Sequence, residues 1–210
     1  MTEAEWIECT DGNRMLRFLL QHPTGRKWRL FQCAWCRYVL ADTLTYEPLL
    51  AAVETAERYT DRLVADDERQ MVWEKMEKMA EEAMAEQDFE RASVAADARD
   101  CVAVGSQQIV GLERKSPFQR PQYQCHLLRD IFGNPFRPVT VEQDWLASKD
   151  GLVPRLAKAI YDERAFEQMP ELANALEEAG CNNEDLLGHC RQPGQHVRGC
   201  WVVDLLLGYK

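Results

Sequence analysis

Cysteine and histidine side chains, which bind metal ions and take part in nucleophilic catalysis, are concentrated near the C terminus. The last thirty residues hold three of the eight cysteines and two of the four histidines. Structural zinc takes four such ligands, commonly as two pairs at short spacing. His196 and Cys200 are four apart and share a face if both lie on one helix. We therefore predict a zinc site of Cys181, Cys190, His196 and Cys200, with His189 as the alternative to Cys190 because adjacent side chains point in different directions.

The same residues support two other interpretations. Free cysteine is among the most buried residue types, so Cys181, Cys190 and Cys200 could simply fill a core. A Cys/His hydrolase would instead pair Cys190 or Cys200 with His196, and Asp204 would orient the imidazole. No element of an oxyanion hole can be identified in the sequence. The pattern leaves core packing, zinc binding and thiol catalysis open.

Cys33 and Cys36 have the spacing of metal knuckles and of redox motifs. They fall inside a helical pattern, not on a tight turn, and no alternation of strands and helices surrounds them. The three-residue spacing places both sulfur atoms on one helix face. Core packing is the favoured interpretation, and metal binding or a thiol contact is the alternative.

A rigid proline-containing segment at 127–138 carries arginine and aromatic residues. One interpretation is an ion-paired connector that packs Phe132 and Phe136 into the core. The other is a binding surface formed by Arg129, Phe136 and Arg137, because rigid loops with arginine and aromatic side chains make good anchors.

Helices must position all these residues, because apolar side chains recur every three or four positions along most of the chain. Only 139–141 resembles a strand. We predict an all-α fold with a multi-helix N-terminal bundle at 1–115 and a compact C-terminal helical unit at 122–210, separated by a proline-containing break at 116–121. The expected helices cover 15–19, 26–44, 48–59, 66–90, 89–104, 127–132, 154–160, 170–179, 183–187 and 198–207.

Composition limits the classes of partner. The 210 residues carry a formal net charge of -10, which disfavours binding to nucleic acid or to an anionic membrane surface. Most of that charge lies between Tyr46 and Asp100, a stretch that contains 16 acidic and 7 basic residues. The N-terminal residues do not form a signal peptide, and no apolar run reaches the roughly 18 to 20 residues of a membrane helix. We therefore expect a cytoplasmic protein with reduced thiols and no membrane or nucleic-acid partner.

Four segments together resemble one large family of paralogous planctomycete proteins. They are 1–6 (MTEAEW), 29–37 (RLFQCAWCR), 127–138 (LLRDIFGNPFRP) and 196–208 (HVRGCWVVDLLLG). The resemblance spans nearly the whole chain and is weakest at 71–99. It implies no substrate and no catalytic residue. It does imply that the following residues occupy family motif positions: Cys33, Cys36, Cys181, His189, Cys190, His196 and Cys200.

The function expected from these patterns is a non-enzymatic interaction or regulatory module that binds a protein partner, with zinc as the candidate stabilising ion. Phosphate loops, zinc-protease motifs, nucleophile elbows and dinucleotide fingerprints do not occur in the sequence. A family with many divergent copies also fits binders of different partners. Two alternatives remain: a hydrolase that uses the C-terminal Cys/His cluster, and an acidic immunity-type inhibitor of a basic toxin.

Overall fold

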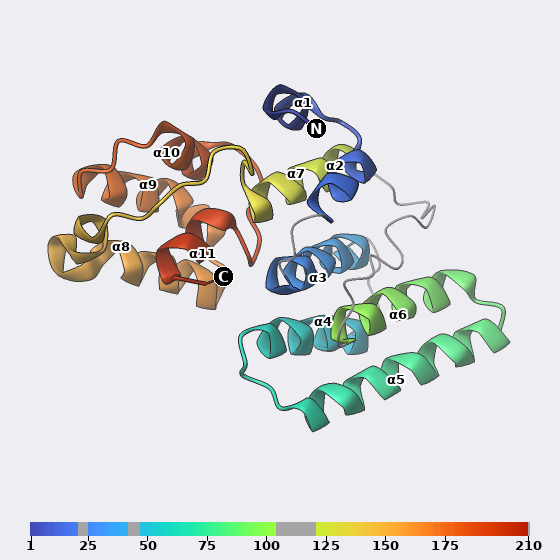
Figure 1. Cartoon of the computed structure of the whole chain (residues 1–210). Helices are drawn as coiled ribbons and strands as arrows, with labels where there is room; N and C mark the ends of the chain where they lie inside the picture. Colours follow the sequence, from blue (N-terminus) through green and yellow to red (C-terminus); the bar gives the residue numbers. More distant parts are fainter. Residues whose placement is uncertain (21–24, 42–46, 104–120, 210) are drawn as a thin grey trace. The chain divides into compact units, whose positions relative to one another are not determined.

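The computed structural model describes residues 1–20, 25–41, 47–103 and 121–209. These residues form eleven α-helices and one short 3-10 turn, with no strand among them (Figure 1). The predicted all-α class is therefore confirmed. Within the described ranges, no helix combines the length and the apolar character that crossing a membrane requires.

The chain divides into two compact units. Thr10–Cys125 forms one, here called the N-terminal unit. Met1–Cys9 together with His126–Lys210 forms the other, here called the C-terminal unit. The division falls inside α7 (Pro121–Phe132), and the break predicted at 116–121 lies outside the described residues, apart from the backbone of Pro121.

The N-terminal unit is a helical bundle. Its helices are α2 (Gly12–Leu19), α3 (Gly25–Ala41), α4 (Glu47–Thr60), α5 (Asp66–Ala85) and α6 (Phe89–Val102). The sequence explains several helix starts. Asp11 caps α2 by accepting bonds from the backbone N–H groups of Asn13 and Arg14. Pro48 lies in the first turn of α4, and α5 opens with three acidic residues.

The core of this bundle lies between α3, α4, α5 and α6, which contact one another. Cys33 and Cys36 are buried there on α3, beside Cys101 of α6. The hydrogen-bonding thiols of Cys33 and Cys36, together with burial, raise the pKa of Cys101 well above its usual value. At neutral pH Cys101 is therefore a protonated core thiol. Cys33 and Cys36 are buried in the same core, as the packing interpretation expects.

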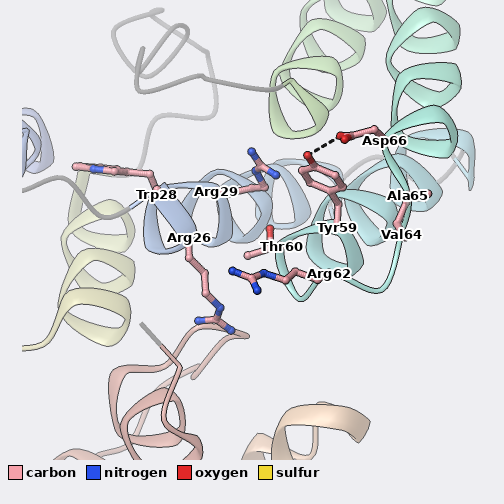
Figure 2. Close-up of a pocket in the computed structure, with 10 residues that line it drawn as sticks. Arg26, Trp28, Arg29, Tyr59, Thr60, Arg62, Val64, Ala65 and Asp66 are labelled. Carbon is pink, nitrogen blue, oxygen red and sulfur yellow. Dashed lines mark hydrogen bonds between the residues drawn. The ribbon is translucent and has the colours of Figure 1, made fainter.

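A turn joins α4 to α5 in the same unit. Tyr59 near the end of α4 donates a hydrogen bond of 2.7 Å to the Asp66 carboxylate at the start of α5 (Figure 2). The guanidinium carbon of Arg29 lies 4.9 Å from the centre of the Tyr59 ring, and that of Arg69 lies 5.5 Å from it. These contacts connect α3, α4 and α5 around one aromatic side chain.

The C-terminal unit consists of α1 (Glu3–Glu8), the greater part of α7, α8 (Gln143–Glu163), η1 (Phe166–Gln168), α9 (Met169–Glu178), α10 (Glu184–Arg191) and α11 (Trp201–Leu207). It surrounds a second core, built mainly by α8, α9, α10 and α11. Residues 148–151 interrupt α8 with non-helical backbone, so Pro154 lies in the first turn of its second half. Asn183 caps α10 by accepting a bond from the backbone N–H of Leu186.

The short helix α1 belongs to this unit although it begins the chain. Its capping box pairs Thr2 with Glu5. Arg129 of α7 donates hydrogen bonds to the carbonyl oxygens of Trp6 (2.8 Å) and Cys9 (2.6 Å). Trp6 is almost completely buried, so α1 contributes to the structure of the unit.

The segment 139–141, which alone resembles a strand in the sequence, lies outside the helices and forms no strand. One prediction about local structure was wrong. The last helix begins at Trp201, not at Arg198, and Cys200 is its N-cap residue. The cause is Gly199, whose φ of 98° lies in the left-handed region that glycine adopts readily and that ends helical continuity there.

Candidate metal centre

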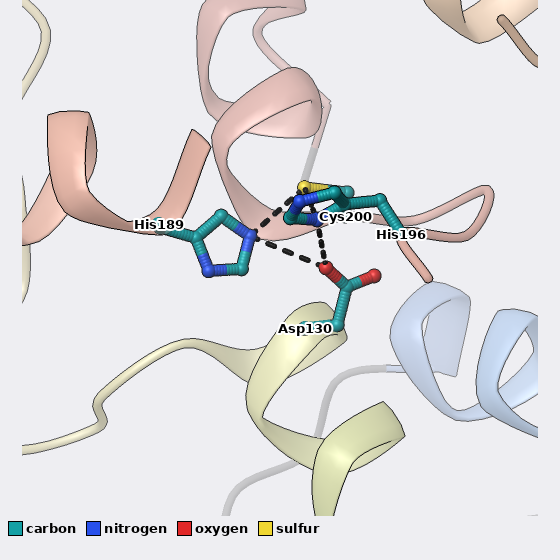
Figure 3. Close-up of side chains that lie close together, drawn as sticks. All are labelled: Asp130, His189, His196 and Cys200. Atoms are coloured by element: carbon teal, nitrogen blue, oxygen red, sulfur yellow. Dashed lines mark hydrogen bonds and ion pairs between the residues drawn. The ribbon is translucent and has the colours of Figure 1, made fainter. Parts of the chain in front are cut away.

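Four buried side chains meet inside the C-terminal unit: Asp130, His189, His196 and Cys200 (Figure 3). Asp130 comes from α7 and His189 from α10. His196 lies in the segment between α10 and α11, and Cys200 lies at the start of α11. The group is therefore supplied by α7, by α10 and by the stretch from His196 to Cys200 that leads into α11, and each residue is at most 9% exposed.

The donor atoms lie close enough together to bind one small metal ion after small shifts. All four lie within 4.8 Å of one another. Asp130 Oδ1 is 2.6 Å from His196 Nδ1 and 3.2 Å from His189 Nε2. Cys200 Sγ is 3.2 Å from His189 Nε2 and 3.9 Å from His196 Nδ1. Tetrahedral zinc, with bonds of 2.0 to 2.3 Å, places its ligand atoms roughly 3.3 to 3.8 Å apart, so small shifts would fit the group around one ion.

Asp130 is held in its charged form. Burial alone would raise its pKa, but hydrogen bonds and charge interactions with His189 and His196 outweigh burial and lower the pKa to about 2. The second oxygen, Oδ2, accepts a 3.0 Å bond from the backbone N–H of Val197. The carboxylate is thus ionised at neutral pH and fixed in orientation, as metal ligands usually are.

His189 is held in its neutral form. Burial lowers its pKa, and the neighbouring Asp130 only partly opposes that effect. The side-chain amide of Gln192 lies 3.1 Å from Nδ1. Because an amide can present either its oxygen or its nitrogen, Gln192 can stabilise the tautomer that leaves Nε2 available to a metal ion.

The hydrogen bonding of His196 is incomplete. Its Nδ1 faces Asp130, but its Nε2 is buried and has no hydrogen-bond partner within the described part of the chain. A buried polar atom without a partner costs about 1 to 3 kcal/mol. Nδ1 is the ring nitrogen that faces the other members of the group, and an ordered water molecule is a usual partner for a buried polar atom such as Nε2.

Cys200 is completely buried, and its thiol is neutral without a metal ion. Burial and the charge of Asp130 raise its pKa well above 9, against the opposing effect of the backbone N–H groups of Val202 and Val203. A metal ion would displace the thiol proton and bind the thiolate. A substrate could not reach this sulfur atom in the structure.

Close packing sets the path of the segment that carries His196. A Cβ atom placed on Gly194 would lie 2.9 Å from Cε1 of His126, so only glycine fits there without displacing the imidazole. Nε2 of His126 in turn lies 2.8 Å from the carbonyl oxygen of Gln195. α7 therefore holds this segment through His126 and, one helical turn later, through Asp130.

The structure brings together part of the set predicted from the sequence. His196 and Cys200 belong to the group, and so does His189, the alternative to Cys190. Cys181 and Cys190 do not: both are buried in the apolar core of the C-terminal unit. Burial raises the pKa of Cys190 to about 12, which is typical of a neutral core thiol.

The pattern of cysteines and histidines in the sequence does not predict Asp130 as a ligand. A signal was available: Leu127, Leu128 and Ile131 are the apolar residues around it on one helix, and all are fully buried. A carboxylate on the buried face of a helix needs hydrogen bonds or a metal ion. The periodicity of 127–131 could have identified it.

The residues predicted to form a binding surface make contacts within the C-terminal unit. Arg129 holds α1 through backbone carbonyl groups, as described above. Arg137 forms an ion pair with Glu3 and lies 3.8 Å from Asp185. Phe136 is 37% exposed. Arg129 and Arg137 thus have structural contacts, and a recognition role for this surface stays a prediction.

Comparisons with protein-family models, curated proteins and solved structures gave no match to this chain. The resemblance to the planctomycete family therefore stays a prediction, and the candidate function depends on the geometry of the Asp130, His189, His196 and Cys200 group.

Proposed function

We propose that this chain is a non-enzymatic interaction module whose C-terminal unit is stabilised by one zinc ion bound to Asp130, His189, His196 and Cys200. The observation that carries the proposal is the meeting of four buried metal-binding side chains with all donor atoms within 4.8 Å. Asp130 lies far in the sequence from His189, His196 and Cys200, so one ion would hold α7, α10 and the start of α11 together.

Zinc is the metal that suits this donor set best. It accepts nitrogen, sulfur and carboxylate oxygen ligands together and prefers four of them in a tetrahedron. Calcium and magnesium prefer oxygen ligands in larger numbers. The charges also suit a divalent ion, because the Asp130 carboxylate and the Cys200 thiolate would together neutralise it.

A structural role is favoured over a catalytic one. Catalytic zinc keeps one coordination position for water or substrate and takes three ligands from the protein. Here four protein ligands would complete the tetrahedron, and all four residues are buried.

The hydrolase alternative receives less support from the same geometry. A nucleophilic cysteine must be ionised and accessible. Cys200 is fully buried with a raised pKa. The proposed partner is accordingly another protein bound at the surface, not a substrate bound at this cluster.

Metal analysis of matched variants tests the proposal. The protein, produced without a metal-binding tag, is expected to contain about one zinc ion per chain. Cys200→Ser should lose the ion, whereas Cys181→Ser, a change at another buried cysteine of the same unit, should retain it. A chain that binds no zinc after reconstitution, or equal loss in both variants, would contradict the proposal.

A further inference from the structure

A groove lies between α5 and α6, the two helices of an antiparallel hairpin in the N-terminal unit (Figure 1). Its volume is about 590 Å³. The residues that line it recur every three or four positions on both helices, from Glu77 to Met84 on α5 and from Phe89 to Arg99 on α6. At 1.5 Å per residue, the side formed by α6 is roughly 15 Å long, which matches about three turns of a partner helix.

The groove has an apolar floor and an apolar end. Ala80, Ala92 and Ala96 form the floor and are at most 8% exposed. Met84 and Phe89 lie at the end nearest the connecting turn, and they are 54% and 66% exposed. Two large apolar side chains exposed at one groove form a patch of the kind that marks interaction sites. The small floor residues leave room for the side chains of a partner, and the flexible thioether of Met84 adapts to them.

The groove lies in the acidic part of the chain. Between Glu74 and Asp100 there are 9 acidic and 4 basic residues, so the local net charge is 4 minus 9, or -5. Glu81 lines the groove, and Glu90 follows Phe89 at the start of α6. Neither carboxylate has a hydrogen bond or an ion pair among the described residues. Three of the four basic residues are already in ion pairs: Lys78 with Glu82, Arg91 with Glu86, and Arg99 with Glu77.

This charge distinguishes between the possible occupants of the groove. A second copy of the same hairpin would place like charges opposite one another, which costs free energy. Nucleic acid and anionic membranes are repelled for the same reason. A helix with lysine or arginine beside an apolar stripe matches both features, because its cations face the acidic side chains while its apolar side chains cover Met84 and Phe89.

We propose that this groove binds a basic amphipathic helix of a partner protein. The apolar face of that helix lies on Met84, Phe89 and the alanine floor, and its cationic side chains pair with Glu81 and Glu90. The inference rests on the proposed interaction function, and it adds the binding surface and the chemistry of the partner. The proposed zinc centre belongs to the other unit.

Fluorescence anisotropy with labelled synthetic peptides tests the proposal on the full chain at physiological salt. The first peptide has about 14 residues, or four helical turns, with leucine at every third or fourth position and lysine elsewhere. The second has the same composition in an order that gives no apolar helix face, and the third has glutamate in place of lysine. We expect the first peptide to bind at least about tenfold more tightly than either of the others.

A pair of double variants locates the binding surface. Met84→Gln together with Phe89→Gln removes the apolar end of the groove without changing the net charge, and it should weaken binding of the first peptide by about tenfold or more. Leu63→Gln together with Met71→Gln is the matched control. Both of these residues are 63% exposed in the same unit, and neither lines the groove. The control variant should bind like the unchanged protein.

Equal effects of the two double variants would overturn the proposal, and so would equal binding of the three peptides. Sedimentation equilibrium tests the remaining occupant: a dimer that dissociates when Met84 and Phe89 are changed would assign the groove to a second copy and overturn the proposal. Zinc content measured on the same samples separates this inference from the metal site. Zinc-loaded protein that binds no peptide refutes only the groove, and peptide binding by a chain that takes up no zinc refutes only the zinc centre.

Discussion

Asp130 is the residue on which the candidate metal centre most depends, because both histidines and a backbone N–H group bond to its carboxylate. Asn has the same shape but replaces one acceptor oxygen with a donor NH₂ group, which would face either an imidazole N–H or the N–H of Val197. We expect Asp130→Asn to lower the free energy of unfolding by about 1 to 3 kcal/mol in chelator and to weaken zinc binding further. Urea unfolding with and without zinc separates the two effects.

Asp162→Asn provides the comparison for that measurement. Asp162 is exposed and pairs with Lys158 one turn earlier on α8. Its substitution should change the free energy of unfolding by no more than about 0.5 kcal/mol. Equal changes in the free energy of unfolding would show that the buried contacts of Asp130 do not stabilise the protein more than an exposed ion pair does.

The protonation states of the cluster predict how zinc affinity depends on pH. The Cys200 thiol, with its raised pKa, is protonated at neutral pH and must lose a proton on binding. His189, with its lowered pKa, is already neutral and loses none. Raising the pH by one unit near neutrality should therefore increase the zinc association constant by about tenfold. Competition against a coloured chelator at several pH values measures this, and an affinity independent of pH would argue against thiolate ligation.

At the scale of single residues, the sequence made part of the site predictable. The high density of cysteine and histidine in the tail identified His196, Cys200 and His189. The sequence could not show that Asp130 is a ligand in place of Cys181 and Cys190. Cysteines that pack in a core and cysteines that bind a metal ion can have the same spacing. That distinction depends on which side chains α7 brings near α10, a tertiary contact between residues about sixty positions apart in the chain.

Two glycines close in sequence to His189 and His196 allow a matched pair of substitutions. Gly194→Ala would bring a methyl group within 2.9 Å of the His126 ring, so either this ring or the segment that carries His196 would have to move. We expect a loss of about 1 to 3 kcal/mol in the free energy of unfolding, together with weaker zinc binding.

Gly188→Ala is the companion change, one position before His189. A Cβ atom at Gly188 meets nothing within 4 Å, and alanine is the better helix former in α10. This change should stabilise the protein by about 0.5 to 1 kcal/mol without altering zinc binding. Thermal unfolding of both variants measures the effect on stability, and zinc titration measures the effect on zinc binding. Unimpaired zinc binding in Gly194→Ala would show that this segment tolerates displacement.

At the scale of elements, helices were more predictable than their ends. Pro48, Pro170 and Asn183, the first residues of three predicted helices, lie in the first turn or at the N-cap of the observed helices. The start of the last helix was misplaced because Arg198 continues the helical pattern, whereas the left-handed backbone of Gly199 breaks it. His196 and Cys200 therefore approach each other through a bend in the chain, not along one helix face.

The whole molecule has two units with separate cores, and this organisation predicts a selective effect of chelation. If zinc connects α7, α10 and α11, its removal should loosen the C-terminal unit and leave the N-terminal bundle intact. Hydrogen exchange followed by mass spectrometry should show faster exchange in peptides from 126–209 and unchanged exchange in those from 25–103. Equal acceleration in both groups of peptides would contradict a zinc centre confined to one unit.

The contact between α1 and α7 delays the folding of α1 during synthesis of the chain. Arg129 bonds the carbonyl oxygen of Trp6 across 123 positions of sequence, and at translation rates of 5 to 20 residues per second that interval lasts roughly 6 to 25 s. A helix as short as α1 is not stable by itself in water. The ribosome therefore completes the whole Thr10–Cys125 bundle while the first nine residues still lack the surface that orders them. The first helix of the chain is among the last to become stable.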